Sequence, residues 1–327
     1  MHYAVGANAT EETYGRQAAG TGEVMNEVPE TDQRCGFVAV VGAPNAGKST
    51  LVNALVGTKV SIVSPKVQTT RFRVMGIAMV GEAQVVLVDT PGIFAPKKRL
   101  ERAMVAAAWG GTNDADHICL LIDAAKGYDD ESRAIVDKLK ETKRQAILVL
   151  NKVDLVKRDK LLGLTAQLDA EGIFTDVFMI SALKGDGIDD LLAHLGKLVS
   201  PGPWMFPEDQ VSDLPQRLLA AEITREKAFI ALYQELPYSL HVETEKWEEK
   251  EDGSARIDQV IYVERESQKP IVLGKAGRQI KSIGASARQE LEELLERRVH
   301  LFIHIKVRED WSEKRGHYSE IGLDFDS

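Results

Sequence analysis

Short apolar runs alternate with amphipathic stretches along the first two thirds of the chain. Val, Ile and Leu dominate these runs, which cover residues 37–41, 84–88, 117–122, 145–150 and 176–180. Continuous apolar runs of this length are typical of strands buried on both faces, so they predict a mostly parallel sheet with helices between the strands. Residues 71–80 predict one further strand, antiparallel at an edge, which gives a six-stranded mixed α/β domain.

The pattern changes after residue 199, where helix-breaking residues accumulate. The stretch 200–215 contains four prolines and predicts a linker. Beyond it, the pattern predicts a smaller α+β domain made of a helix at 216–234, strands at 238–247 and 255–264, a glycine-containing turn, a helix at about 282–296 and a strand at 299–307. We therefore divide the chain into an acidic tail (1–35), a first domain (36–199), a linker (200–215), a second domain (216–311) and a C-terminal tail (312–327).

Composition narrows the class of protein. The 327 residues, 44% of them hydrophobic, are enough for two cores. A net charge of −9 argues against a protein that coats nucleic acid nonspecifically, so any nucleic-acid contact must be local.

Targeting signals and cysteines point to the cytosol. No apolar run approaches the roughly 18 residues that span a bilayer, so we expect no transmembrane segment. The acidic tail lacks the features of signal and transit peptides, and we expect it to be disordered. Two cysteines, Cys35 and Cys119, make no disulfide framework, which fits a reducing compartment.

A phosphate-binding loop follows the first predicted strand. The segment from Gly42 to Ser49 matches GxxxxGK[ST] and directly precedes a predicted helix at 49–56. Such a loop turns successive N–H groups toward phosphates at a helix N-terminus, while Lys48 reaches the β and γ phosphates and Ser49 ligates Mg²⁺. The predicted nucleotide contacts of this loop are Gly42, Ala43, Pro44, Asn45, Ala46, Gly47, Lys48, Ser49 and Thr50.

Two further segments predict the metal site. The third β-rich run closes on Asp89, Thr90, Pro91 and Gly92, where Asp89 can hold the Mg²⁺ shell and the Gly92 N–H can meet the γ-phosphate. Thr70, in the polar stretch 68–71, is expected to complete the shell only when γ-phosphate is present. The predicted metal ligands are Ser49, Thr70 and Asp89. The predicted nucleotide contacts after the third run are Asp89, Thr90, Pro91, Gly92 and Ile93.

Two strand-end motifs predict the base. In Asn151-Lys-Val-Asp154, the acceptor-only carboxylate of Asp154 can pair with the adjacent N1–H and N2–H₂ donors that guanine presents and adenine lacks. We expect Asn151 to tie the base to the phosphate loop, Lys152 to cover the ring, and the Ala182 N–H to meet guanine O6. The predicted base contacts are Asn151, Lys152, Val153, Asp154, Ser181, Ala182 and Leu183, and the predicted ligands are GTP and GDP with Mg²⁺.

The second domain carries a GxxG turn between an apolar run and a helical pattern. GxxG is the KH signature, in which two glycines let the backbone approach the phosphates of single-stranded RNA. The window 267–289 contains five basic residues and no acidic one, which is unusual in an acidic chain. The predicted RNA contacts are Gly274, Lys275, Ala276, Gly277, Arg278 and Lys281.

The motif order GAPNAGKS, QTTR, DTPGI, NKVD and SAL, followed by a helix-first KH domain, resembles the Era-type GTPases from Gly36 to Trp311. The resemblance implies a P-loop GTPase domain followed by a type II KH domain. It also implies a role in 30S ribosomal subunit assembly, with the KH domain binding the 3′ end of 16S ribosomal RNA. Family members are described as loosely associated with the inner face of the membrane, so we expect a cytoplasmic protein with possible peripheral membrane association. We further expect a monomer.

One position departs from the Ras pattern. Ile93 stands where Ras-type enzymes carry the glutamine that orients the attacking water, which predicts slow intrinsic hydrolysis. Catalysis would then rest on Lys48, Asn45, Thr70 and Gly92, on Mg²⁺ and on any group that a partner supplies. In related GTPases the position of Asn45 is associated with a monovalent cation, and K⁺ is a hypothesis here.

Two other functions remain open at this point. The chain could be a constitutive RNA-binding protein that holds a guanine nucleotide structurally, or a GTPase whose KH-like domain binds protein. We favour a switch in which GTP orders the loops around Thr70 and Ile93 and thereby changes the affinity for RNA.

Overall fold

The computed structural model describes residues 32–233, 236–309, 311, 315, 318 and 322–327. The expectation of a disordered tail therefore falls almost entirely outside the described residues.

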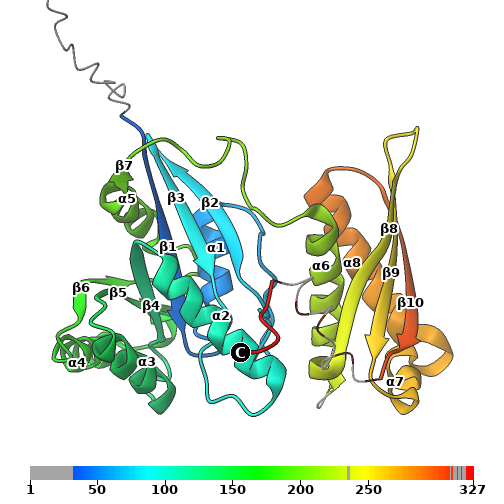
Figure 1. The fold of residues 1–327 in the computed structure, drawn as a ribbon, viewed down its shortest axis with the longest axis horizontal. Coiled ribbons are helices and arrows are strands. Elements are labelled where there is room, and N and C mark those ends of the chain that lie inside the picture. The colour runs from blue at the N-terminus through cyan, green and yellow to red at the C-terminus, as the bar shows by residue number, and fades with distance from the viewer. Residues whose placement is uncertain (1–31, 234–235, 310, 312–314, 316–317, 319–321) are drawn as a thin grey trace, which may run out of the picture. The chain divides into compact units, whose positions relative to one another are not determined.

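Six strands form the main sheet in the order β2-β3-β1-β4-β5-β6 (Figure 1). Among these six strands only the β2–β3 pair is antiparallel, so the predicted fold class, a mostly parallel sheet with an antiparallel edge strand, is confirmed. A two-residue strand, β7, adds a short antiparallel pairing with the start of β1. The strands are β1 (Arg34–Gly42), β2 (Val74–Val80), β3 (Ala83–Asp89), β4 (His117–Asp123), β5 (Ala146–Asn151), β6 (Phe174–Met179) and β7 (Ser200–Pro201).

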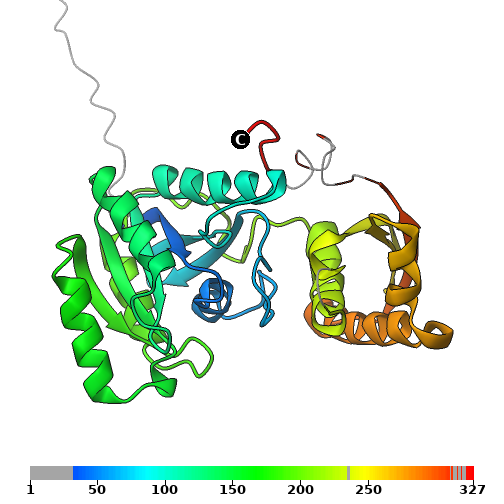
Figure 2. The ribbon, with the colours of Figure 1, turned by 90° about the horizontal axis from the view of Figure 1, so that it is seen from below.

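Helices cover both faces of this sheet, as Figure 2 shows. Side chains alternate along β1, so Val38 and Val40 pack with α1 and α5, whereas Ala39 and Val41 pack with α2, α3 and α4. The two apolar layers hold the carboxyl ends of the strands at one edge, where the predicted motifs lie. The elements are α1 (Lys48–Val56), α2 (Arg99–Asp114), α3 (Asp130–Glu141), η1 (Val153–Leu155), α4 (Arg158–Asp169) and α5 (Ile188–Leu198).

The second domain packs helices on a three-stranded sheet of order β10-β9-β8. Strands β8 and β9 are antiparallel, and β9 and β10 are parallel. Helices α6 and α8 bury apolar residues against one face of this sheet. The elements are α6 (Gln216–Ala231), η2 (Leu236–Ser239), β8 (Leu240–Glu249), β9 (Ala255–Val263), η3 (Glu266–Gln268), α7 (Lys269–Leu273), η4 (Lys275–Gly277), α8 (Arg278–Leu295) and β10 (Val299–Val307).

Helix boundaries in this domain differ from the predicted ones. Helix α8 begins at Arg278 rather than near residue 282, and α6 ends at Ala231 rather than at 234. The short helix α7 was not predicted, because its residues 271–273 form an apolar run typical of a strand. Pro270 is tolerated there since the first turn of a helix does not need its N–H.

Several segment ends also differ from the division made on sequence. Strand β1 begins at Arg34, inside the predicted tail, and β7 lies inside the predicted linker. Of the predicted C-terminal tail, Tyr318 and Leu323 are buried with Phe72 and Met104 of the first domain. The apolar character of these tail residues is therefore used in packing.

The linker is held to β3 and β2 of the main sheet by hydrogen bonds. Gln84 of β3, fully buried, accepts hydrogen bonds from the backbone N–H groups of Met205 (2.9 Å) and Phe206 (3.0 Å) and donates one to the Phe206 carbonyl (2.8 Å). Further on, the Ile77 N–H of β2 donates to the Val211 carbonyl (2.9 Å). The linker thus covers the open edge of β2, which would otherwise present unpaired backbone groups.

None of the helices in the described part of the chain has the length and apolar character needed to cross a membrane.

Replacing Gln84 by alanine should release the linker. The Met205 and Phe206 N–H groups would lose their acceptor, and we expect the free energy of unfolding to fall by about 2 kcal/mol. Urea denaturation followed by circular dichroism measures this change. Gln216→Ala, at an exposed position of α6, is the control and should change stability little; equal stability of both variants and wild type would contradict the linker's role.

Candidate functional site

The phosphate loop between β1 and α1 is held in a strained, closed form. Asn45 and Gly47 have positive φ values of 63° and 100°. A Cβ atom on Gly47 would lie 2.3 Å from the Asn151 amide nitrogen, so only glycine fits there. The Lys48 ammonium curls into the loop and donates to the carbonyls of Gly42 (3.1 Å) and Ala43 (3.0 Å). Burial lowers the pKa of Lys48 to about 8, and a bound phosphate would favour its charged form.

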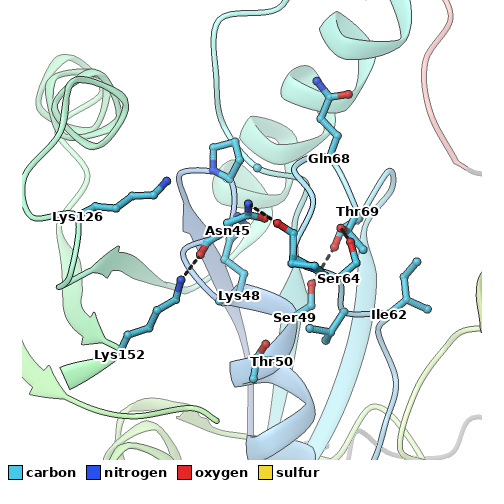
Figure 3. A pocket seen from close by; sticks show the side chains of 16 residues that line it. Asn45, Lys48, Ser49, Thr50, Ile62, Ser64, Gln68, Thr69, Lys126 and Lys152 are labelled. Atoms are coloured by element: carbon cyan, nitrogen blue, oxygen red, sulfur yellow. Dashed lines mark hydrogen bonds between the residues drawn. The ribbon is translucent and has the colours of Figure 1, made fainter. Parts of the chain in front are cut away.

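A pocket of about 410 Å³ opens over this loop (Figure 3). The phosphate loop forms one wall, the segment 62–70 forms another, and the side chains of Lys126 and Lys152 lie on the far side. Three basic residues around one cavity suit a polyphosphate. Of the predicted contacts, the pocket lining includes Pro44, Asn45, Gly47, Lys48, Ser49, Thr50, Thr70, Gly92 and Lys152.

The predicted metal ligands lie together. The hydroxyl groups of Ser49 and Thr70 are 2.8 Å apart. Asp89 is fully buried, and neither of its carboxylate oxygens has a hydrogen-bond partner among the described residues. Burial raises the pKa of Asp89. Two hydroxyls beside an unpaired carboxylate are an oxygen-only set that fits Mg²⁺, whose charge would offset the cost of burying this anion.

The two base motifs are bonded to each other and to the phosphate loop. The Asn151 amide donates to the Ala46 carbonyl (2.9 Å), and its oxygen accepts from the Ala182 N–H (3.0 Å). The Lys152 ammonium contacts the Asn45 carbonyl (2.7 Å) and the Asp123 carboxylate (2.7 Å). The phosphate loop and the segments at the ends of β4, β5 and β6 therefore form one connected network.

Some predicted contacts lie away from the pocket. Asp154 forms an ion pair with Lys184 at 3.3 Å, and Leu183 points outward with 86% of its surface exposed. Ile93 is buried in the core, where its N–H donates to the Gly42 carbonyl (3.2 Å), so its side chain does not reach the pocket.

Sequence reasoning missed several residues of this site. Asp123 ends β4 as Asp89 ends β3, and that position alone could have identified it. Lys126 and the segment 62–65 carry no motif, and only the fold brings them to the pocket.

The segment joining α1 to β2, residues 57–73, contacts the second domain on both sides of Thr70. The buried guanidinium of Arg225 in α6 donates to the Thr69 carbonyl (2.5 Å) and pairs with Glu222. On the other side, the buried guanidinium of Arg71 donates to the Leu240 carbonyl (2.8 Å). Burial, together with the nearby charge of Arg225, lowers the pKa of Arg71.

The same segment caps the end of α6. The Lys66 ammonium donates to the carbonyls of Phe229 and Leu232, and Lys59 pairs with Glu226 at 2.8 Å. The Val63 N–H also donates to Glu226 (2.6 Å). Helix α6 is thus the surface on which this segment rests.

The GxxG loop connects α7 to α8. Gly274, Ala276 and Gly277 all have positive φ values, between 55° and 74°. A Cβ atom on Gly274 would lie 2.6 Å from the Gln279 Cβ, so glycine is required. Lys275, Arg278 and Lys281 are exposed at or next to the loop, where they can contact a phosphate backbone.

Comparison with known proteins gives consistent results. A family described as "50S ribosome-binding GTPase" matches residues 37–152, and a family described as "KH domain" matches residues 235–312. GTPase Era of Bradyrhizobium sp. (strain BTAi1) is 59% identical over 91% of this chain and 96% of that protein. GTPase Era of Rhizobium meliloti is also 59% identical, over 89% of this chain and 93% of that protein.

Among solved structures, the crystal structure of Era in complex with MgGDPNP and nucleotides 1506–1542 of 16S ribosomal RNA has a TM-score of 0.84 and 41% identity. The match covers 89% of this chain and 99% of that chain. Together with the ordered motifs at the strand ends and the GxxG loop, these relatives show that the chain belongs to the Era family of GTPases.

Proposed function

We propose that this GTPase binds the 3′ region of 16S ribosomal RNA through its KH domain, that GTP with Mg²⁺ controls this binding, and that the protein acts in 30S ribosomal subunit assembly. The Era structure that holds MgGDPNP and 16S ribosomal RNA supports the choice of ligands. The exposed basic residues at the GxxG loop support a local RNA contact on an acidic chain.

One observation carries the proposed control by GTP. Thr70, the predicted ligand that senses the γ-phosphate, lies between two residues anchored in the second domain, Thr69 through Arg225 and Arg71 through Leu240. If binding or loss of Mg²⁺ and the γ-phosphate shifts the backbone at Thr70, Thr69 and Arg71 can follow only if their partners in the second domain move with them or these bonds break. The segment 57–73 would therefore contact both the bound nucleotide and the RNA-binding domain.

The proposed reaction is GTP plus water to GDP plus phosphate. Lys48 and the phosphate loop would neutralise the developing charge, Mg²⁺ held by Ser49, Thr70 and Asp89 would add to this, and the Gly92 N–H would meet the γ-phosphate. The buried Ile93 offers no polar group to orient water. Slow intrinsic hydrolysis is the expected consequence.

Asn45 is the proposed site of a catalytic monovalent cation. Its side-chain amide donates to the Pro65 carbonyl (3.1 Å) and so bridges the phosphate loop to the segment 57–73. Amide and backbone carbonyl oxygens of this kind can ligate K⁺, and a cation beside the phosphates would stabilise the transition state.

We expect hydrolysis to be about tenfold faster in KCl than in NaCl at equal ionic strength, and Asn45→Ser to remove the difference. Single-turnover GTP hydrolysis measures both rates. Equal rates of the wild type in the two salts would eliminate the K⁺ site.

Two further assignments concern the oligomeric state and the location: a monomer, and a cytoplasmic protein with peripheral association at the inner membrane face. The membrane association rests on the family resemblance alone. Sedimentation equilibrium and flotation with anionic lipid vesicles test them. A dimer, or no flotation above a protein-only control, would refute the respective assignment.

Reversing the charges of the GxxG loop should abolish RNA binding. In Lys275→Glu with Arg278→Glu, two phosphate contacts become repulsive, and we expect the affinity for the 3′ segment of 16S ribosomal RNA to fall about a hundredfold at fixed salt. The control Lys246→Glu with Lys250→Glu changes the net charge equally, on β8 and the turn after it. Equal losses in both variants would indicate a nonspecific charge effect, and no loss in either would favour a protein partner for the KH domain.

Lys66→Ala should uncouple the nucleotide from RNA. The wild type is expected to bind RNA at least about fivefold more tightly with a non-hydrolysable GTP analogue than with GDP. Without the Lys66 bonds to the end of α6, this ratio should fall toward one, while the affinity for GDP stays unchanged. Lys160→Ala, at an exposed position of α4, should keep the wild-type ratio.

Fluorescence anisotropy of labelled RNA with each nucleotide measures these ratios. A wild-type ratio of one would favour the constitutive RNA-binding protein with a structural nucleotide. A wild-type ratio retained in Lys66→Ala would show that Lys66 has no part in the coupling.

A further inference from the structure

An open pocket of about 200 Å³ lies at the end of α6 beside α7, outside the nucleotide site. Its walls are mostly apolar, with one side-chain amide among them. The lining residues are Ala231, Leu232, Tyr233, Leu236, Ile271 and Gln279.

Large apolar side chains are exposed around this pocket. Tyr233 is 78% exposed, and Ile271 of α7 is 57% exposed. Ile230 and Leu273 add further exposed apolar surface from the same two helices. These side chains do not pack in the core of the domain. A cluster of exposed apolar side chains is typical of an interaction surface.

The pocket is continuous with the GxxG loop. Helix α7, which carries Ile271, ends at Leu273, and the next residue, Gly274, opens the loop. Gln279 belongs to both structures, because it packs against Gly274 and its side chain donates to the Ala231 carbonyl (2.9 Å). A strand of RNA held at the loop would therefore have this pocket as its immediate neighbour.

We propose that the pocket binds one nucleobase of the RNA strand that crosses the GxxG loop, stacked on the Tyr233 ring. The inference rests on the proposed RNA-binding function and adds a base site to it. The Lys66 ammonium lies 5.6 Å from the centre of the Tyr233 ring, so it offers a positive charge to the adjoining phosphate. The Gln279 amide can accept or donate a hydrogen bond at the edge of the base.

Two features favour a nucleobase over a peptide as the occupant. An exposed aromatic ring next to a loop built for phosphates combines the stacking surface and the backbone contact that single-stranded RNA requires. Two positive charges, Lys66 beside the Tyr233 ring and Lys275 in the GxxG loop, suit a phosphodiester chain. Lys66 also belongs to the segment 57–73, so a base stacked on the Tyr233 ring would lie near the element that carries Thr70.

The test uses the full-length protein with a GTP analogue and the 3′-terminal segment of 16S ribosomal RNA, shortened stepwise from either end. The protein variants are Tyr233→Ala and, as the matched control that keeps the ring, Tyr233→Phe. Circular dichroism confirms that each variant is folded. In parallel, 2-aminopurine is placed at each position of the longest RNA, because its fluorescence is quenched when it stacks.

We expect Tyr233→Ala to weaken the binding of the longer RNAs by about fivefold to a hundredfold, and to leave unchanged the shortest RNA that still binds. One 2-aminopurine position should be quenched in the wild type and in Tyr233→Phe but not in Tyr233→Ala. Equal affinities of wild type and Tyr233→Ala for every RNA length would overturn the base site and leave the proposed function intact. A loss of equal size at every length would also overturn it, and failure of the wild type to bind any of the RNAs would overturn both proposals.

Discussion

Two buried guanidinium groups determine how the parts of this protein meet. Arg225 and Arg71 are both almost fully buried, and burying such a charge is costly unless it is paired. Arg225 is paired with Glu222 and bonded to the Thr69 carbonyl, while Arg71 is bonded to the carbonyls of Tyr238 in η2 and Leu240 at the start of β8. Breaking the bonds of either arginine would leave a buried charge without a partner. The chain on both sides of Thr70 is therefore held to the second domain.

Because of these contacts, one wall of the nucleotide pocket is supported by the second domain. In the pocket, one side is built from strand ends and the phosphate loop, which the sheet holds rigidly. The opposite side is the segment 62–70, whose backbone is supported by α6 through Glu226, Lys66 and Arg225. The site therefore joins a rigid half that can bind phosphates to a second half whose position depends on the KH domain.

The RNA-binding side is connected to the same element. The end of α6 accepts hydrogen bonds from Lys66 at Phe229 and Leu232 and from Gln279 at Ala231. Those three carbonyls are neighbours at the C-terminal end of one helix, so a shift of that end would also move the partner of Gln279 at the base of the GxxG loop. Coupling of this kind needs only short, continuous contacts and a helix that moves as a unit.

The sequence by itself determined the two domains, the mostly parallel sheet, the phosphate loop and the KH signature. Local chemistry was sufficient there, because glycine positions, strand-end carboxylates and apolar periodicity act within a few residues. It also predicted that Ser49, Thr70 and Asp89 lie close together, and the structure brings these three side chains together. Helix α7 was not predicted because the apolar run 271–273 has the pattern of a strand. A single turn of helix is too short to show a helical pattern of apolar positions.

Only the tertiary structure decided which distant segments meet. Nothing in the local sequence of Lys66, Gln84 or Arg225 indicates a partner 120 to 170 residues away. Their roles follow from burial: once the two domains and the linker pack, each polar group excluded from water must find a partner across the new boundary. Which partner each group finds depends on how distant segments pack in the folded chain, so it cannot be predicted from a local sequence pattern.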